Sequence, residues 1–159
     1  MARSPVTRSH YVRPRGVRNR RAAGGVVFRY FRKRIYILLT RQPHFTHYIL
    51  PKGGVEDGET PAQAACREIT EETGVDHLCV VGLLGVRSRL SFNKKKWTTT
   101  RYFLFSSDQL RPGATAHDQY QARWFNIDKL PPILWREQAG LISLARGKIT
   151  KYLANDARG

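Results

Sequence analysis

The 159-residue chain is poor in sulfur: it has two cysteines, Cys66 and Cys79, and one methionine. Two cysteines are too few for a disulfide framework or a cysteine-ligated metal cluster, so we expect a reducing, cytoplasmic setting. The longest uninterrupted run of aliphatic and aromatic residues covers only 35–39, whereas a membrane span needs roughly 20 such residues. No apolar signal-peptide core follows the first methionine, although organellar targeting by the basic first residues stays open.

Acidic residues are also scarce, and they are unevenly distributed. The chain has 28 Lys+Arg against 12 Asp+Glu and a net charge of +16. Residues 1–55 contain 13 basic residues and no acid, whereas residues 56–76 contain seven acids and one base. The basic surface suits anionic partners such as nucleotides, inositol phosphates or nucleic acid. The acidic segment indicates a place where carboxylates gather.

The order of the predicted elements indicates a single mixed α/β domain. Residues 1–20 are rich in arginine and show no apolar period, so we expect a flexible basic arm, through which nucleic acid could bind. The folded domain is expected over 21–155. We expect strands over 26–30, 35–40, 78–90, 98–105 and 123–126, a loop over 43–54, and helices over 60–73 and 134–153, the second helix broken by Gly140 and Gly147.

The helix over 60–73 has clear signals at both ends. Thr60 is the expected N-cap, Pro61 the first helical residue, and Gln63 the residue that closes a capping box. Gly74 occupies the position where a left-handed residue ends a helix. The helix therefore has a defined start, and its faces can be read from the 3.6-residue period.

Three glutamates, Glu68, Glu71 and Glu72, share about 100° of this helix by that period. Glu68 and Glu72 form a like-charge i,i+4 pair near the helix C-terminus, where negative charge is unfavourable. A magnesium ion, which prefers oxygen ligands, would relieve this repulsion. The local pattern alone leaves a metal site and a solvated face equally open.

The wider spacing is specific. The segment 53–75 matches the pattern G-x5-E-x7-R-E-U-x-E-E-x-G-U, where U is aliphatic, at all nine specified positions. This pattern is the Nudix box, and the chain resembles the Nudix (MutT-like) hydrolases. Weaker similarity extends from 22–27 to 123–125. The residues at the nine specified positions of the box are Gly53, Glu59, Arg67, Glu68, Ile69, Glu71, Glu72, Gly74 and Val75.

The resemblance implies an α/β/α sandwich around a mixed sheet, and Mg²⁺-dependent hydrolysis, with Mn²⁺ as an alternative, of the pyrophosphate linkage in a compound that carries a nucleoside diphosphate. By the same resemblance, Glu68, Glu71 and Glu72 are side-chain metal ligands, and a backbone carbonyl near Gly53 completes the set. Glu68, Glu72 and Arg67 form the implied catalytic group. The implied orienting residues are Arg67, Gly53, Gly54, Glu59 and Gly74.

Outside the box, the residues give weaker indications. In the family a later carboxylate often serves as the base, and here Asp118 is the candidate, with Glu68 as the alternative. For each basic or aromatic candidate, a solvated or packing role stays open. The candidates for phosphate binding are Arg41, Lys52, Lys94, Lys95, Lys96 and Arg101, and those for stacking a base are Phe45, Tyr48, Trp97 and Tyr102.

The segments that flank the box narrow the substrate class. Residues 50–56 and 92–105 resemble Nudix members that act on dinucleoside polyphosphates, nucleotides or diphosphoinositol polyphosphates. We therefore favour a dinucleoside polyphosphate or a nucleoside triphosphate. The alternatives are a diphosphoinositol polyphosphate, the 5′ end of RNA, or a basic nucleic-acid-binding protein with incidental hydrolysis.

Overall fold

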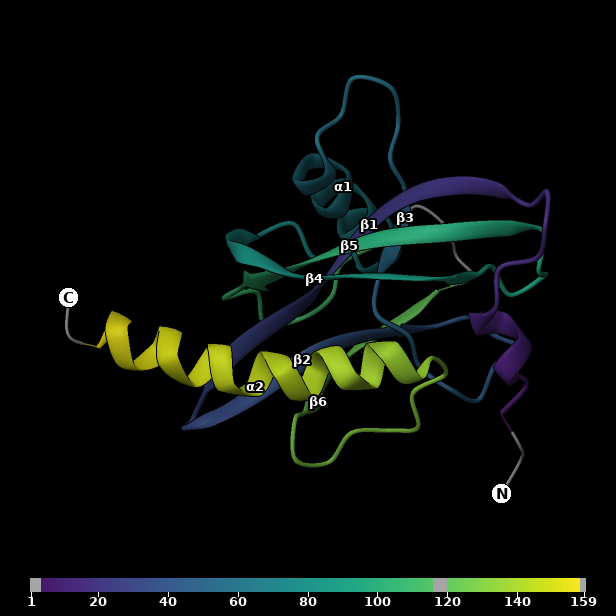
Figure 1. Ribbon diagram of the computed structural model, residues 1–159. Helices are drawn as coiled ribbons and strands as arrows, with labels where there is room; N and C mark the ends of the chain where they lie inside the picture. The colour runs from purple at the N-terminus through teal and green to yellow at the C-terminus, as the bar shows by residue number, and fades with distance from the viewer. Residues whose placement is uncertain (1–3, 116–119, 158–159) are drawn as a thin grey trace.

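A mixed β-sheet lies between two helices in the computed structural model, which describes residues 4–115 and 120–157 (Figure 1). The strand order is β4-β5-β1-β2-β6, with β3 paired to β1. Strands β1 and β5 are parallel, and the other strand pairs are antiparallel. This arrangement confirms the expected α/β/α sandwich. The elements are η1 (Arg8–Tyr11), β1 (Arg18–Phe31), β2 (Arg34–Arg41), β3 (Lys52–Gly54), α1 (Pro61–Thr73), β4 (Cys79–Leu90), β5 (Lys96–Ser106), β6 (Gln121–Asn126) and α2 (Arg136–Asp156).

Each face of the sheet carries its own apolar cluster, and β1 contributes to both. Val26 and Phe28 pack in the cluster that contains Ile149 of α2. Val27 packs in the cluster that contains Ile69 of α1. Successive residues of a strand point to opposite faces, so the run of apolar residues in β1 is that of a central strand covered on both sides.

Helix α1 begins and ends where the sequence predicts. The Thr60 side chain accepts a hydrogen bond from the Gln63 backbone N–H at 3.2 Å, and the Thr60 N–H donates to the Gln63 side chain at 2.9 Å. Gly74 ends the helix in the left-handed conformation, with φ of 69°. These caps fix the axial position of the glutamates.

Helix α2 differs from the prediction because Gly140 and Gly147 do not break it. Each glycine costs about 1 kcal/mol in a helix relative to alanine. Leu141, Ile142 and Ile149 are fully or almost fully buried against the sheet. Burying a side chain of this size contributes about 1.5–3 kcal/mol, so packing outweighs the low helix propensity. In the described part of the chain, no helix has the length and apolar character needed to cross a membrane.

The N-terminal segment also differs from the flexible arm that we expected. Residues 8–11 form a 3-10 helix, and β1 begins at Arg18, so the sheet extends into the predicted arm. His10 is only 3% exposed, and its ring lies 5.6 Å from that of Trp135. A buried aromatic contact thus holds this segment to the domain, which periodicity could not reveal in so short a stretch.

Strand β3 lies within the predicted loop over 43–54. It pairs with β1 through Ala22↔Gly54, Ala23↔Gly53 and Gly24↔Lys52. A Cβ at Gly24 would lie 2.3 Å from the Pro51 carbonyl oxygen, so the close approach of the two chains requires glycine there. This pairing places the start of the box against the central strand.

Candidate active site

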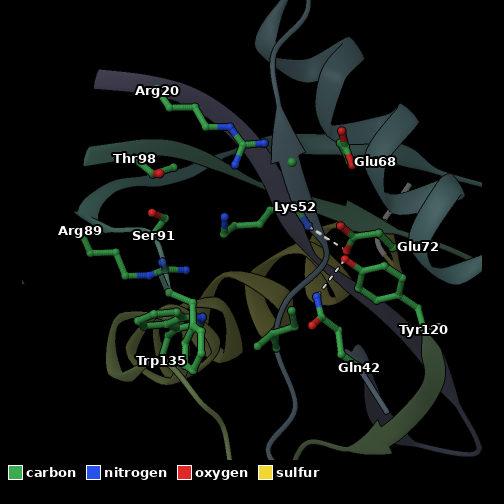
Figure 2. Close-up of a pocket in the computed structure, with 13 residues that line it drawn as sticks. Arg20, Gln42, Lys52, Glu68, Glu72, Arg89, Ser91, Thr98, Tyr120 and Trp135 are labelled. Atoms are coloured by element: carbon green, nitrogen blue, oxygen red, sulfur yellow. Dashed lines mark hydrogen bonds between the residues drawn. The ribbon is translucent and has the colours of Figure 1, made fainter. Parts of the chain in front are cut away.

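A cleft of about 360 Å³ opens between α1, β3 and the N-terminal half of β1 (Figure 2). Its walls differ in charge: carboxylates from α1 lie on one side, and cations from β1, β3 and β4 lie on the other. The lining residues are Arg20, Gln42, Ile49, Lys52, Gly53, Glu68, Glu72, Arg89, Ser91, Phe92, Thr98, Tyr120 and Trp135.

The carboxylate wall consists of Glu68 and Glu72, and Glu72 is only 6% exposed. Its Oε2 accepts the backbone N–H of Lys52 at 3.3 Å. Burial, together with the charge of Glu68, raises the pKa of Glu72 to about 8. A carboxyl with such a pKa marks a point where negative charge is crowded and poorly solvated.

Arg67 joins the helix to the preceding loop. Its Nε donates to Glu59 Oε2 at 2.8 Å, and its Nη2 donates to the Gly54 carbonyl at 2.9 Å. Its Nη1 donates to Glu68 Oε1 at 2.8 Å and to Glu71 Oε2 at 3.3 Å. The hydrogen bond from Arg67 holds the pKa of Glu59 at about 2. Arg67 thus connects Glu59, Gly54, Glu68 and Glu71, and its orienting role stays a prediction.

The three glutamates do not converge on one point, as the periodicity suggested they could. Glu68 and Glu71 turn toward Arg67, and Glu72 turns toward the Lys52 N–H. Among the residues that the structure describes, no ready-made cluster of three metal donors is present. The donor chemistry nevertheless fits a hard divalent cation, because all the donors are oxygens and because a cation would offset the burial and the charge of Glu68, which raise the pKa of Glu72.

The opposite wall is cationic, and the strand register explains how it forms. Arg20 of β1 pairs with Thr98 of β5, and Thr98 pairs with Arg89 of β4, so the three side chains form a row across the sheet. Lys52 lies between this row and Glu72 (Figure 2). Burial, together with the charges of Arg89 and Arg20, lowers the pKa of Lys52 to about 8. Positive charge is therefore crowded around Lys52, as negative charge is crowded around Glu72.

A smaller cavity of about 130 Å³ adjoins the cleft and has aromatic walls. Phe92 and Trp135 line both cavities. Phe45 lines the smaller cavity, and its ring centroid lies 5.1 Å from that of Phe92. The arrangement offers aromatic faces next to cations, which suits a heterocyclic base joined to phosphates.

Of the predicted site residues, Glu68, Glu72, Lys52 and Gly53 line the cleft. Glu71 is more exposed than Glu68, at 37% against 16% of its side chain. The Asp118 prediction falls on residues 116–119, outside the described residues.

Other predicted binding residues lie elsewhere. Tyr48 is buried in the core against Phe125, at 4.7 Å between ring centroids. Arg41 binds Gln121 at 2.7 Å. Arg101 follows the buried Thr100 in β5 and therefore points to the other face of the sheet. Tyr102 is buried in the core, whereas Lys94, Lys95 and Lys96 are exposed around the β4–β5 turn.

Sequence reasoning missed Arg20, Arg89 and Trp135. Arg20 was placed in the arm, and Arg89 was one of many basic residues on a predicted strand. Their convergence depends on the pairing of β1, β5 and β4, which joins segments far apart in the chain. The available signal was the alternation of Arg87 and Arg89 in the predicted strand, which did not show which of them faces the cleft.

Comparisons with known proteins bear on the family and the fold. The model of the NUDIX domain matches residues 18–145. The chain is 31% identical over 96 residues to the asymmetrical bis(5′-nucleosyl)-tetraphosphatase of Rattus norvegicus, covering 59% of this chain and 65% of that protein. It is 31% identical over 116 residues to the RNA pyrophosphohydrolase of Bartonella quintana, covering 67% of this chain and 58% of that protein.

The fold is similar to a crystal structure of the C. elegans Ap4A hydrolase in a binary complex. The TM-score is 0.71 at 23% identity, covering 83% of this chain and 98% of that one. At 23% sequence identity, the similarity between the two structures establishes a shared fold only. The chain spans 58–65% of the length of the two curated relatives named above.

Proposed function

Because the chain belongs to the NUDIX domain family, we propose that it is a metal-dependent hydrolase of pyrophosphate linkages in nucleoside polyphosphates. The observation that carries the proposal is the pairing of two charged walls in one cleft, with Glu68 and Glu72 facing Lys52, Arg20 and Arg89. A polyphosphate needs cations around its oxygens, and a bound divalent cation needs carboxylates. The cleft offers both.

Glu68, Glu71, Glu72 and the carbonyl of Gly53 are the groups that we assign to Mg²⁺, or to Mn²⁺. When bound there, the metal would offset phosphate charge and lower the pKa of a water molecule. Arg67 orients Glu68 and Glu71 through its Nη1, at 2.8 and 3.3 Å. The backbone N–H of Lys52 orients Glu72 at 3.3 Å.

The cationic wall binds the phosphates away from the bond that breaks. Arg20 and Arg89 present planar guanidinium groups with several donors, which suit phosphate oxygens. Lys52 adds a point charge close to Glu72. For the proton of the attacking water, our candidate bases are Asp118 and Glu68.

The aromatic cavity supports a nucleotide over a diphosphoinositol polyphosphate. An inositol ring has no aromatic face and would gain little from Phe45, Phe92 and Trp135, which line this cavity. A base stacked there would place its phosphates beside Arg89 and Lys52. We therefore favour a dinucleoside polyphosphate or a nucleoside triphosphate as substrate.

A second candidate is the 5′ end of RNA. The register pairs Arg18 with Lys96 two residues beyond the Arg20–Thr98 pair, so the cationic row continues past the cleft. A longer anionic chain would use this extension. The RNA pyrophosphohydrolase relative is consistent with this alternative.

An assay with Mg²⁺ separates the candidates. Diadenosine tetraphosphate, nucleoside triphosphates, ADP-ribose, a diphosphoinositol polyphosphate and capped RNA are compared, and the products are identified. We expect the highest kcat/KM for a nucleotide with three or more phosphates. Equal rates on all five would refute the assignment of the aromatic cavity, and a preference for RNA that falls steeply with salt would favour the second candidate.

Glu72→Gln tests the proposed role of this carboxylate in hydrolysis, because the substitution keeps the shape of the side chain and removes its charge. The matched variant is Asp57→Asn, because Asp57 is exposed and lies outside the cleft lining. We expect loss of hydrolysis for Glu72→Gln and retained hydrolysis for Asp57→Asn. Full activity of Glu72→Gln would refute the proposed mechanism.

A further inference from the structure

The segment 4–17 contacts the residues behind the cationic wall of the cleft. Tyr11 donates its hydroxyl hydrogen to Glu137 Oε2 at 2.7 Å. The guanidinium of Arg136 lies 3.9 Å from the centroid of the Tyr11 ring. His10 precedes Tyr11 in the chain, and its Nε2 lies 3.3 Å from the Phe92 carbonyl oxygen. The segment thus reaches the cleft from outside through α2 and the β4–β5 turn.

Glu137 is the shared partner that links Tyr11 to the cleft. Its Oε1 accepts the Nε hydrogen of Arg89 at 2.5 Å, while its Oε2 is used by Tyr11. The side chains of Arg89 and Glu137 are only 5% and 9% exposed. The guanidinium carbon of Arg89 also lies 3.3 Å from the Trp135 ring centroid. Its Nη1 also donates to the Leu90 carbonyl at 3.0 Å, so a buried carboxylate, a ring and a backbone carbonyl together set the direction of the guanidinium.

Tyr11 remains a donor at all ordinary pH values. Burial, together with the hydrogen bond to Glu137, raises the pKa of Tyr11 to about 12. A protonated hydroxyl can satisfy one carboxylate oxygen and leave the other free for Arg89. Tyr11 and Arg89 thus each hold one oxygen of the Glu137 carboxylate.

This contact lies outside the matched domain. The match to the NUDIX domain begins at residue 18, whereas Tyr11 lies in η1. In this chain, a segment that precedes the matched region therefore supports one wall of the cleft.

We propose that Tyr11 is a positioning residue for the phosphate-binding Arg89, acting through Glu137. The proposal rests on the proposed function in one respect, that Arg89 binds a phosphate of the ligand. Without the Tyr11 hydroxyl, the Glu137 carboxylate can turn away from Arg89 Nε, and the guanidinium is then held only by the Leu90 carbonyl and the Trp135 ring. The phosphate side of the site then loosens, while the glutamates of α1 keep their own contacts.

The test measures binding and turnover separately. Binding of β,γ-methylene-ATP in the presence of Mg²⁺ is measured by calorimetry for wild type, Tyr11→Phe, Arg89→Lys and the double variant. The control is Val12→Ala, because Val12 is 65% exposed and adjoins Tyr11 in the chain. Hydrolysis of the preferred substrate gives kcat and KM for the same proteins.

For Tyr11→Phe we expect a Kd and a KM raised about three- to tenfold, as for partial loss of a hydrogen bond to a charged group. We expect kcat to change less than about twofold, since the chemistry lies at the other wall. In the Arg89→Lys background, Tyr11→Phe should add less than about twofold to the Kd. Val12→Ala should bind as wild type does.

The outcomes distinguish this inference from the proposed function. An unchanged Kd for Tyr11→Phe, or an equal loss with and without Arg89→Lys, would overturn the positioning role even if hydrolysis is confirmed. A fall in kcat without a change in Kd would also overturn it. If no substrate is hydrolysed but Tyr11→Phe weakens nucleotide binding only when Arg89 is present, the inference stands and the proposed function fails.

Discussion

Gly53→Ala tests whether the position of the Glu68 carboxylate controls activity. An ideal Cβ at residue 53 would lie 2.1 Å from Glu68 Cδ, and 2.2 and 2.3 Å from its two carboxylate oxygens. Nonbonded carbon atoms approach to about 3.5–4.0 Å, so the carboxylate must retreat by roughly 1.5 Å. A displacement of about 1 Å at a reacting centre can cost about 100-fold in rate. We therefore expect kcat to fall by about 100-fold or more.

The assay is steady-state hydrolysis of the preferred substrate over a Mg²⁺ titration. We expect the half-saturating Mg²⁺ concentration to rise as well, because Glu68 is an assigned ligand. The matched control is Gly82→Ala in β4, where a Cβ would meet nothing within 4 Å. Both variants should stay folded, since neither glycine has a positive φ. Wild-type kcat and Mg²⁺ dependence in Gly53→Ala would refute the claim that Glu68 must remain against Gly53.

Three further perturbations test other parts of the site. Arg67→Lys keeps the charge but loses the fork that reaches Glu59, so kcat should fall about 10- to 100-fold, in a steady-state assay, with a smaller change in KM; an unchanged kcat would contradict this. In metal-free protein, the raised pKa of Glu72 contributes stability that is fully present below pH 4.5 and is lost as pH rises through about 8. The Tm measured in EDTA should therefore fall over that pH range for the wild type, and it should fall less for Glu72→Gln. Replacing Glu137 by Gln breaks a buried ion pair with Arg89 and should cost about 3–5 kcal/mol of unfolding free energy, measured with urea; a loss below about 1 kcal/mol would show that the pair is solvated.

The carboxylate wall of the cleft could be predicted because its determinants are local in the chain. The Thr60 cap and Gly74 fix the ends of α1, and the helical period then places Glu68, Glu71 and Glu72 on adjoining faces. What the period could not supply is the direction of each carboxylate. That direction depends on Arg67, which draws Glu68 and Glu71 to itself.

The cationic side could not be predicted because its determinants are distant in the chain. Arg20 enters the cleft only because β1 extends back to Arg18 and pairs with β5. Trp135 reaches the cleft from the N-terminus of α2, a helix that packs on the opposite face of the sheet from α1. Composition showed an excess of arginine, but only the strand register selects which arginines face the cleft.

The parallel ladder between β1 and β5 has a consequence for the order of folding. It pairs Arg18 with Lys96 and Phe28 with Ser106, so each pair closes a loop of 78 residues. The C-terminal end of β1 also forms a local hairpin with β2, through the pairs Phe31↔Arg34 and Phe28↔Ile37. Nonlocal pairs form slowly because loop closure must precede their stabilising contacts. We therefore expect Arg20 to acquire its β5 partner late, so that the cationic wall assembles after the β1–β2 hairpin.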